Sequence, residues 1–254
     1  MCGICGCATQ ELHDDINHSH AHDHQHHLNE IKIEQDILAT NNALALNNRN
    51  YLQKHQILTL NIMSSPGAGK TTLLTKTIAD LQDSLPFFVI VGDQQTDRDA
   101  KRFSKLNIPA LQINTGKGCH LDAHSIHHAL DELKIPQSSI LLIENVGNLV
   151  CPALFDLGEA YKIIILSVTE GTDKPLKYPY MFHDADVVIL SKTDLLPYVD
   201  FDMDQCCGFI NQISPKTKIV SVSTKTEDNL TLWYQWLKDI WNQQQHDTKN
   251  TNKN

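Results

Sequence analysis

The sequence has no long hydrophobic run, and its first residues do not predict an export signal. No stretch of its 254 residues approaches the roughly 18 consecutive apolar residues of a membrane-spanning helix. The N-terminus lacks the basic-then-apolar layout of a secretory signal peptide, and Cys2 stands where N-myristoylation requires glycine. We therefore expect a cytoplasmic protein with no membrane partner.

Positive charge is also scarce. The chain has 21 lysine and arginine residues against 30 aspartate and glutamate residues, a net charge of −9 at pH 7 with neutral histidine. Without an excess or a stripe of basic residues, binding to nucleic acid is not expected. The 41% hydrophobic and 20% charged residues are ordinary for a globular protein, and the length suffices for one domain with extensions.

Apolar side chains are nearly missing from residues 1–27, which we expect to form a disordered metal-binding tail. The tail begins with MCGICGC and continues into a histidine tract. It holds half of the chain's 14 histidines: His13, His18, His20, His22, His24, His26 and His27. In residues 28–56, apolar positions recur at roughly helical spacing and predict one or two amphipathic helices that lead into a domain.

Between residues 57 and 242, short apolar runs alternate with helical patterns. The runs are ILTLNIM, FFVIVG, PALQI, SILLIEN, KIIILSV, DVVILS and KIVSVS. Most are apolar at consecutive positions, as in strands that are covered on both faces. The alternation predicts an α/β fold with a mainly parallel sheet and helices on both faces. The polar residues 243–254 are expected to form a second disordered tail.

The segment NIMSSPGAGKTT follows the first predicted strand and opens a helix, which is the context of a P-loop. It predicts a P-loop NTPase fold, with a G domain over residues 57–242. Backbone N–H groups would wrap a phosphate, Lys70 would reach the β- and γ-phosphates, and the Thr71 hydroxyl would bind Mg²⁺. Ser64 stands where the first glycine is usual, a position that tolerates small residues. The predicted phosphate-binding residues are Gly67, Ala68, Gly69, Lys70, Thr71 and Thr72.

Two acidic residues are candidates for the carboxylate that a Mg²⁺ site needs. Asp93 lies in VIVGDQQTD and Glu144 in LLIENVGN, each at the sheet edge where α/β folds bind ligands. ENVG has the layout of the Asp-x-x-Gly switch of GTPases, with Gly147 as the γ-phosphate sensor. We expect Thr71 and Asp93 to hold Mg²⁺, and to form the catalytic set with Lys70 and Glu144. For each acid, a solvated loop carboxylate is the alternative.

The segment ILSKTDLL indicates guanine as the base. In Asn-Lys-x-Asp GTPases the aspartate accepts hydrogen bonds from guanine N1–H and N2–H₂, and adenine offers no such pair of donors. Lys192 and Asp194 fit this pattern with Ser191 in place of asparagine, and the carboxylate carries the discrimination. Ser223, in SVSTKT one strand later, would lie against the base. These motifs favour GTP and GDP over adenine nucleotides.

The side chain that orients water in Ras-like GTPases is missing from this sequence. Asn148, and not glutamine, follows Gly147. We therefore expect slow intrinsic hydrolysis that serves as a switch or timer and not as metabolic turnover.

The N-terminal tip is the first of two candidate metal sites. Cys2, Cys5 and Cys7 place three thiols on a short segment, and their thiolates can converge on one soft or borderline ion. Stable disulfides between these cysteines are not expected in a reducing compartment. The alternative to a metal site is a set of unstructured thiols. The histidine tract would hold several ions weakly as a reservoir, or serve only as a solvated linker.

The second candidate site lies inside the domain. Cys119 and His120 are adjacent in TGKGCHLDA, and Cys151 follows four residues after Gly147 in GNLVCP. A cysteine close to the γ-phosphate sensor would move when the nucleotide changes, which would link metal binding to the nucleotide state. Three unrelated loop residues are the alternative.

Together these segments resemble the HypB family of hydrogenase nickel-incorporation GTPases, within the SIMIBI-class metallochaperone GTPases. The resemblance rests on CGICGC, the histidine tract, SSPGAGKTT, GDQQTD, TGKGCHLDA, IENVGNLVCP, EGTDKPLKYP and SKTDLLP, and covers nearly the whole chain. It implies nickel delivery during maturation of [NiFe]-hydrogenase. It implies a high-affinity Ni²⁺ site at the tip and a second Ni²⁺/Zn²⁺ site of Cys119, His120 and Cys151. The implied partners are a GTP-dependent second copy, a HypA-type nickel chaperone and the hydrogenase large-subunit precursor.

Two other functions stay open. A urease-type accessory GTPase shares the fold, but CGICGC and the separate Cys119–His120 pair disfavour it. A nickel storage or detoxification protein would use the same ligands with an incidental G domain, and the near-complete nucleotide motifs disfavour that. Nickel itself is implied by the resemblance, because copper or zinc could occupy the same ligands.

Overall fold

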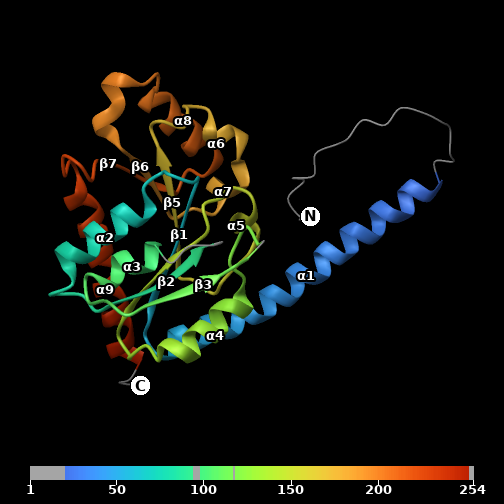
Figure 1. Cartoon of the computed structure of the whole chain (residues 1–254), viewed down its shortest axis with the longest axis horizontal. Coiled ribbons are helices and arrows are strands. Elements are labelled where there is room, and N and C mark those ends of the chain that lie inside the picture. Colours follow the sequence, from blue (N-terminus) through green and yellow to red (C-terminus); the bar gives the residue numbers. More distant parts are fainter. Residues whose placement is uncertain (1–20, 94–97, 117, 252–254) are drawn as a thin grey trace.

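The computed structural model describes residues 21–93, 98–116 and 118–251. The cysteines of the N-terminal tip, Cys2, Cys5 and Cys7, lie outside these ranges, as do the first histidines of the tract. Within the described ranges the chain folds around one sheet with helices on both sides (Figure 1). No helix in this part of the chain combines the length and apolarity that crossing a bilayer requires.

The sheet has seven strands, and each coincides with one of the seven predicted apolar runs. The strands are β1 (Leu58–Ser64), β2 (Phe87–Asp93), β3 (Ala110–Asn114), β4 (Ile140–Glu144), β5 (Tyr161–Ser167), β6 (Val187–Ser191) and β7 (Lys218–Val222). Their order is β3-β2-β4-β1-β5-β6-β7, and all neighbouring pairs are parallel. This confirms the predicted α/β fold with a parallel sheet and places β1 in the middle.

The inner strands are apolar at mostly consecutive positions because helices bury both faces of the sheet. In β4, Ile140 and Leu142 pack into one hydrophobic cluster, whereas Leu141 and Ile143 pack into another. All five residues of β4 are buried. Successive side chains of a strand point to opposite faces, so the two clusters lie on the two sides of the sheet.

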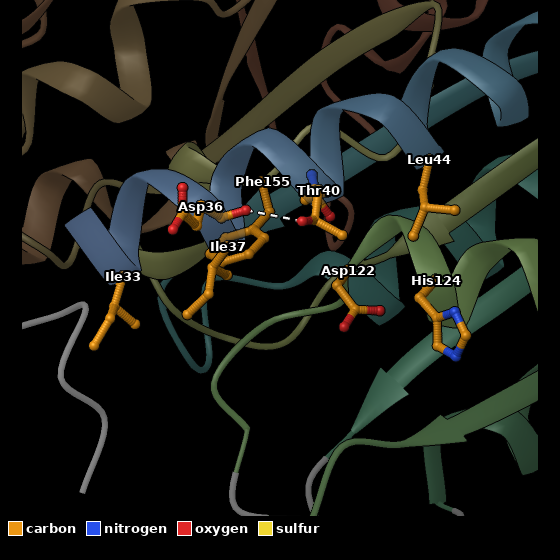
Figure 2. A pocket seen from close by; sticks show the side chains of 9 residues that line it. Ile33, Asp36, Ile37, Thr40, Leu44, Asp122, His124 and Phe155 are labelled. Atoms are coloured by element: carbon orange, nitrogen blue, oxygen red, sulfur yellow. Dashed lines mark hydrogen bonds between the residues drawn. The ribbon is translucent and has the colours of Figure 1, made fainter. Parts of the chain in front are cut away.

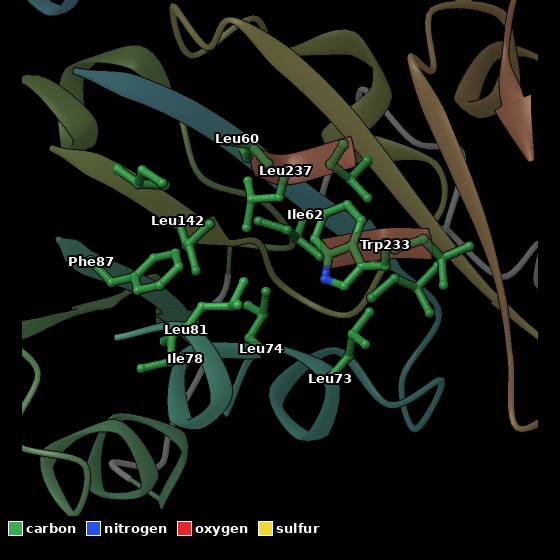
Figure 3. Packing of buried hydrophobic residues seen from close by; sticks show 14 of the residues in the cluster. Leu60, Ile62, Leu73, Leu74, Ile78, Leu81, Phe87, Leu142, Trp233 and Leu237 are labelled. Carbon is green, nitrogen blue, oxygen red and sulfur yellow. The ribbon is translucent and has the colours of Figure 1, made fainter. Parts of the chain in front are cut away.

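Three helices cover one face: α2 (Lys70–Leu81), α3 (Arg98–Ser104) and α9 (Leu230–Thr251). Leu74 and Ile78 of α2 and Trp233 and Leu237 of α9 meet the strand side chains there (Figure 3). The Trp233 indole is fully buried, and its N–H donates to Thr77 Oγ1 at 2.9 Å. The polar end of this large side chain is therefore satisfied inside the core.

The other face is covered in two parts. Helix α4 (Ala123–Leu133) and the C-terminal part of α1 (Ala21–Lys54) pack over β2 and β4, while α7 (Pro179–His183) and α8 (Met203–Ile213) pack over β5 and β6. The remaining elements are the short helices α5 (Cys151–Leu154) and α6 (Lys174–Lys177) and a 3₁₀ helix at Thr193–Tyr198. The N-terminal half of α1 extends away from the sheet (Figure 1).

Both predicted tail boundaries need correction. Helix α1 starts at Ala21, inside the expected tail of residues 1–27, and runs without a break through the expected segment 28–56. Helix α9 continues to Thr251, well into the expected tail of residues 243–254. Neither helix contains glycine or proline, the residues that most strongly end a helix, so the sequence offers no stop signal at either predicted boundary.

Candidate nucleotide and metal sites

The carboxyl ends of the parallel strands meet at one edge of the sheet, and a cavity of about 450 Å³ opens there. The loops after β1, β2 and β4 line it, as expected for ligand sites in open α/β sheets. Its lining includes Pro66, Gly67, Gly69, Lys70, Thr71, Thr72, Asp93, Arg102, Glu144, Asn145 and Gly147. The predicted P-loop, the two predicted acids and the predicted sensor glycine are therefore brought together.

The P-loop has a backbone that requires glycine. Gly67 has φ of 76° and Gly69 has φ of 103°, both in the left-handed region that side chains disfavour. Gly69 is the N-cap of α2, so the first N–H groups of the helix belong to Lys70 and the residues after it. A helix start of this kind is suited to bind phosphate.

Ser64 gives the Lys70 amine a partner inside the protein. Lys70 Nζ donates to Ser64 Oγ at 2.9 Å, and the lysine side chain is buried. The Ser64 hydroxyl in turn donates to the Ser65 carbonyl at 2.6 Å. The residue that departs from the usual P-loop pattern therefore holds the lysine beside the cavity.

The hard oxygen ligands that Mg²⁺ prefers are present on two strand ends. Thr71 Oγ1 donates to Glu144 Oε1 at 2.5 Å, and both side chains are buried. Asp93, the last residue of β2, is half-buried and lines the same cavity. A hydroxyl beside carboxylates fits a Mg²⁺ site, in which phosphates and water supply the other ligands.

Gly147 passes directly over the P-loop. A Cβ atom at this position would lie 3.1 Å from the Pro66 Cα and 3.2 Å from its nitrogen, which is too close for a side chain without movement of the backbone. The segment after β4 and the P-loop are therefore in backbone contact.

The predicted base-reading segment is tied to the P-loop. Ser191 Oγ donates to the Ala68 carbonyl at 2.7 Å, and Lys192 Nζ donates to the Gly67 carbonyl at 2.7 Å. Asp194 Oδ1 accepts from the buried Ser223 hydroxyl at 2.7 Å, which orients the carboxylate. Serine in place of asparagine thus keeps a link between this segment and the phosphate loop.

The domain also brings together the three predicted metal ligands. One sulfur or nitrogen atom each from Cys119, His120 and Cys151 lie within 4.8 Å of one another, and Cys119 Sγ is 3.6 Å from His120 Nδ1. Among the described residues, this is the cluster of three or more cysteine, histidine and acidic side chains that could hold a metal ion. Two thiols and one imidazole suit Ni²⁺, Zn²⁺ or copper, and do not suit Mg²⁺.

His120 is held in a form that can bind metal. Its ring stacks on Phe155 with a centroid distance of 3.8 Å. Burial lowers the pKa of His120, which favours the neutral imidazole, and the neutral ring is the form that ligates metal. Cys151 is fully buried and is the first residue of α5. We refer to Cys119, His120 and Cys151 as the metal trio.

Two asparagines, Asn145 and Asn148, connect the cavity to the metal trio, a role that no motif predicted for either. Asn145 Oδ1 accepts from Val146 N at 2.9 Å and from Leu121 N, next to His120, at 3.2 Å. Asn148 Nδ2 donates to the Cys119 carbonyl at 3.5 Å. Arg102 of α3, which lines the cavity, was also not predicted, because no motif surrounds it.

Helix α1 is hydrogen-bonded to both segments that flank His120 of the metal trio and its stacking partner Phe155. The buried Asn41 accepts from Ala123 N at 2.9 Å and donates to the Asp156 carbonyl at 2.8 Å. Asn48 donates to the Ala123 carbonyl at 2.8 Å. Ala123 follows His120 by three residues, and Asp156 follows Phe155. The helix therefore fixes both segments that position the imidazole.

The chain is similar over most of its length to proteins of one family. The family model described as CobW/HypB/UreG, nucleotide-binding domain, matches residues 58–221. The hydrogenase maturation factor HypB of Azotobacter vinelandii is 53% identical over 208 residues, which cover 82% of this chain and 69% of the relative. HypB of Escherichia coli K12 is 50% identical with coverages of 82% and 72%. The hydrogenase/urease maturation factor HypB of Helicobacter pylori 26695 is 44% identical, with coverages of 79% and 84%.

Solved structures agree. HypB from Helicobacter pylori in complex with nickel superposes with a TM-score of 0.76 at 41% identity, and the match covers 80% of this chain and 96% of that one. HypB from Archaeoglobus fulgidus superposes with a TM-score of 0.75 at 38% identity, with coverages of 80% and 99%. The resemblance noted in the sequence is confirmed: the chain belongs to the HypB group of the CobW/HypB/UreG family.

Proposed function

We propose that this protein is a GTP-hydrolysing nickel metallochaperone that binds Ni²⁺ and delivers it during maturation of [NiFe]-hydrogenase. The observation that carries the proposal is the segment from Glu144 to Cys151. Glu144, Asn145 and Gly147 line the nucleotide cavity, and Cys151 belongs to the metal trio. One short segment therefore serves both sites, as a switch that couples hydrolysis to metal release would require.

In the nucleotide site, Lys70 and the N–H groups at the start of α2 would bind the phosphates, and Thr71, Asp93 and Glu144 would hold Mg²⁺. The bound Mg²⁺ would neutralise charge on the β- and γ-phosphate oxygens. Asp194, oriented by Ser223, would select guanine. The chain has Asn148 where Ras-like proteins have the water-orienting glutamine, so we expect slow, regulatory hydrolysis.

Ni²⁺ is the cargo in this account, and the chain would bind it at two places. Cys2, Cys5 and Cys7, outside the described residues, would form the tighter capture site at the tip, with the histidine tract as a buffer. The metal trio would form the second site, which Zn²⁺ can also occupy. The HypB relative from Helicobacter pylori whose structure contains nickel supports nickel as the metal.

The proposed partners follow from family membership. A second copy of the chain would bind in the GTP state, and a HypA-type nickel chaperone and the hydrogenase large-subunit precursor would exchange the metal in the cytoplasm. A storage role is the alternative that the histidine-rich tail favours. A contribution to urease maturation is a further candidate, because the Helicobacter pylori relative carries that function in its name.

We expect the two nickel sites to be separable by substitution. In the full-length protein, replacing Cys2, Cys5 and Cys7 with alanine should remove the tighter Ni²⁺ site and leave the metal trio as the remaining thiolate site. Adding Cys151→Ala should remove the second site, because a buried thiolate ligand is lost. Competition with a chromophoric chelator measures both affinities. Cys207→Ala is the matched control, since this half-buried cysteine of α8 lies outside both sites and should leave both unchanged.

Retention of every tight site by the triple variant would contradict the capture role of the tip. Delivery and storage are separated in a host that lacks its own HypB protein. If the chain delivers nickel, Cys119→Ala with Cys151→Ala should abolish its support of hydrogenase activity at limiting nickel although the tail is intact. If the chain only stores nickel, that variant should support activity as well as the unmodified chain does.

A further inference from the structure

Helix α4 carries three exposed histidines that the proposed function does not use: His124, His127 and His128. Two of them meet. His124 Nε2 and His128 Nε2 are 3.2 Å apart, with ring centroids at 4.5 Å and ring planes perpendicular. Residues four apart in a helix lie on the same face, one turn above the other, so the backbone itself brings the two imidazoles together.

The distance between the two nitrogens suits one shared ion. Metal–imidazole bonds are about 2.0–2.1 Å long, so nitrogens 3.2 Å apart subtend an angle of about 100° at a common metal. That value lies between the right angle of octahedral geometry and the tetrahedral angle. Zinc metalloproteases bind their metal with two helical histidines at the same i, i+4 spacing. The alternative is a hydrogen bond in which one ring donates to the other.

We infer that His124 and His128 form a two-imidazole surface site for a divalent first-row transition cation, Ni²⁺ in the proposed function. Imidazole suits Ni²⁺, copper and Zn²⁺, and water would complete the coordination. With two protein ligands on an exposed helix face, the ion would exchange readily with solvent. The site is distinct from the metal trio, whose Cys119 and His120 come from the loop before α4 and whose Cys151 begins α5.

The position of the pair indicates what such a site would do. His124 lines a groove of about 420 Å³ between α1 and α4, together with Phe155 (Figure 2). Phe155 stacks on His120 of the metal trio, and α4 begins three residues after His120. His124 is four residues after His120, so the surface pair and the metal trio lie on neighbouring stretches of the chain. We assign the pair as an entry site for the metal trio, and this role rests on the proposed function.

His127 supplies an internal control. It lies on the same helix, but its Nε2 is 4.0 Å from Asp131 Oδ2, and its ring centroid is 6.0 Å from that of His128. Its exposure is similar and its chemistry is identical, yet it has no imidazole partner at chelating distance among the described residues. If bound metal protects His124 and His128 from chemical modification but does not protect His127, the protection therefore comes from the pair and not from general nickel binding by histidine.

Residue-resolved carbethoxylation of the full-length protein tests the occupancy. Diethyl pyrocarbonate modifies imidazole nitrogens, and trypsin releases residues 118–134 as one peptide containing His120 and the three helix histidines. With free Ni²⁺ at ten times the dissociation constant of the surface pair, His124 and His128 should both be modified about tenfold more slowly. The modification rate of His127 should not change. His128→Gln should abolish protection of His124, and His127→Gln should not. His120 reports the metal trio separately.

Equal protection of all three histidines, no protection, or protection of His124 that persists in His128→Gln would overturn the site. The entry role has its own readout: absorbance from nickel–thiolate bonds, followed after rapid mixing in the Cys2, Cys5 and Cys7 to alanine background. Adding His124→Gln and His128→Gln should slow the rise and leave its final amplitude unchanged. An unchanged rate would overturn the entry role. If nickel–thiolate absorbance is missing both with and without the two histidine substitutions, the result would contradict the metal trio instead.

Discussion

Replacing Lys70 with alanine is expected to slow GTP turnover by at least about 100-fold while the protein stays folded. The Lys70 amine lies beside the nucleotide cavity, 2.9 Å from Ser64 Oγ, and is positioned to neutralise charge on the β- and γ-phosphates. Its loss leaves the Ser64 hydroxyl bonded to the Ser65 carbonyl, so no buried hydroxyl is left without a partner. Phosphate release measures turnover, and thermal unfolding measures stability.

Lys76→Ala is the matched control for this variant. Lys76 lies on the same helix but faces outward, where it pairs with Asp80 at 3.0 Å and with Glu227 at 2.9 Å. Surface ion pairs contribute little to stability, so its removal should leave both the unfolding temperature and the turnover nearly unchanged. Undiminished GTP hydrolysis by Lys70→Ala would contradict the assignment of the P-loop.

Replacing Asp194 with asparagine is expected to weaken GTP binding by about 100-fold and to create binding of xanthosine nucleotides. The carboxylate would accept from guanine N1–H and N2–H₂, and an amide loses part of this acceptor capacity. The amide N–H₂ can instead donate to the 2-oxo group of xanthine. Ser223 should continue to donate to the remaining oxygen, as it does to Asp194 Oδ1 at 2.7 Å.

Asp200→Asn is the matched control. Asp200 is exposed and lies just after the 3₁₀ helix that contains Asp194, so the substitution removes one negative charge without changing the predicted base site. This variant should bind GTP as the unmodified protein does, which separates a specific effect from an effect of net charge. Fluorescent GDP and XDP analogues allow both affinities to be measured by titration. Equal hydrolysis of ATP and GTP by the unmodified protein would remove the basis for guanine selection.

The sheet could be predicted because its signal is local. Most of the seven strands are short apolar runs, and burial on both faces makes the runs of the inner strands continuous. The P-loop could be predicted for the same reason, since its glycines, lysine and threonine are consecutive between a strand and a helix. At both ends of the domain the prediction failed: α1 and α9 extend into ranges expected to be disordered, and neither contains the glycine or proline that would mark an earlier end.

The connections between the sites could not be predicted from local pattern. Asn145 accepts a hydrogen bond from Leu121 N, and Asn48 donates to the Ala123 carbonyl; each pair is far apart in sequence. Such contacts exist only after the sheet has brought its loops to one edge, and the residues around an asparagine in the sequence do not indicate its distant partner. By contrast, the spacing of His124 and His128 is local, and their i, i+4 relation on a predicted helix could have indicated the pair.

Coupling between nucleotide and metal is the central claim of the proposed function. Gly147 lies against Pro66 of the P-loop, and Cys151 of the metal trio follows four residues later. Asn145, from the same segment, holds the backbone next to His120. Loss of the γ-phosphate would release Gly147 and shift Cys151 relative to Cys119 and His120, so metal affinity should depend on the nucleotide. Bound metal must change nucleotide affinity by the same factor.

The most direct test is the metal affinity of the trio with GDP and with a non-hydrolysable GTP analogue. Residues 1–27 are deleted and His124 and His128 are replaced by glutamine, so that the trio alone reports in competition with a chromophoric chelator. The account predicts Ni²⁺ affinities that differ by about 5–150-fold between the two nucleotide states. Identical affinities in both states would contradict the coupling and leave GTP to act through dimerisation or partner binding alone.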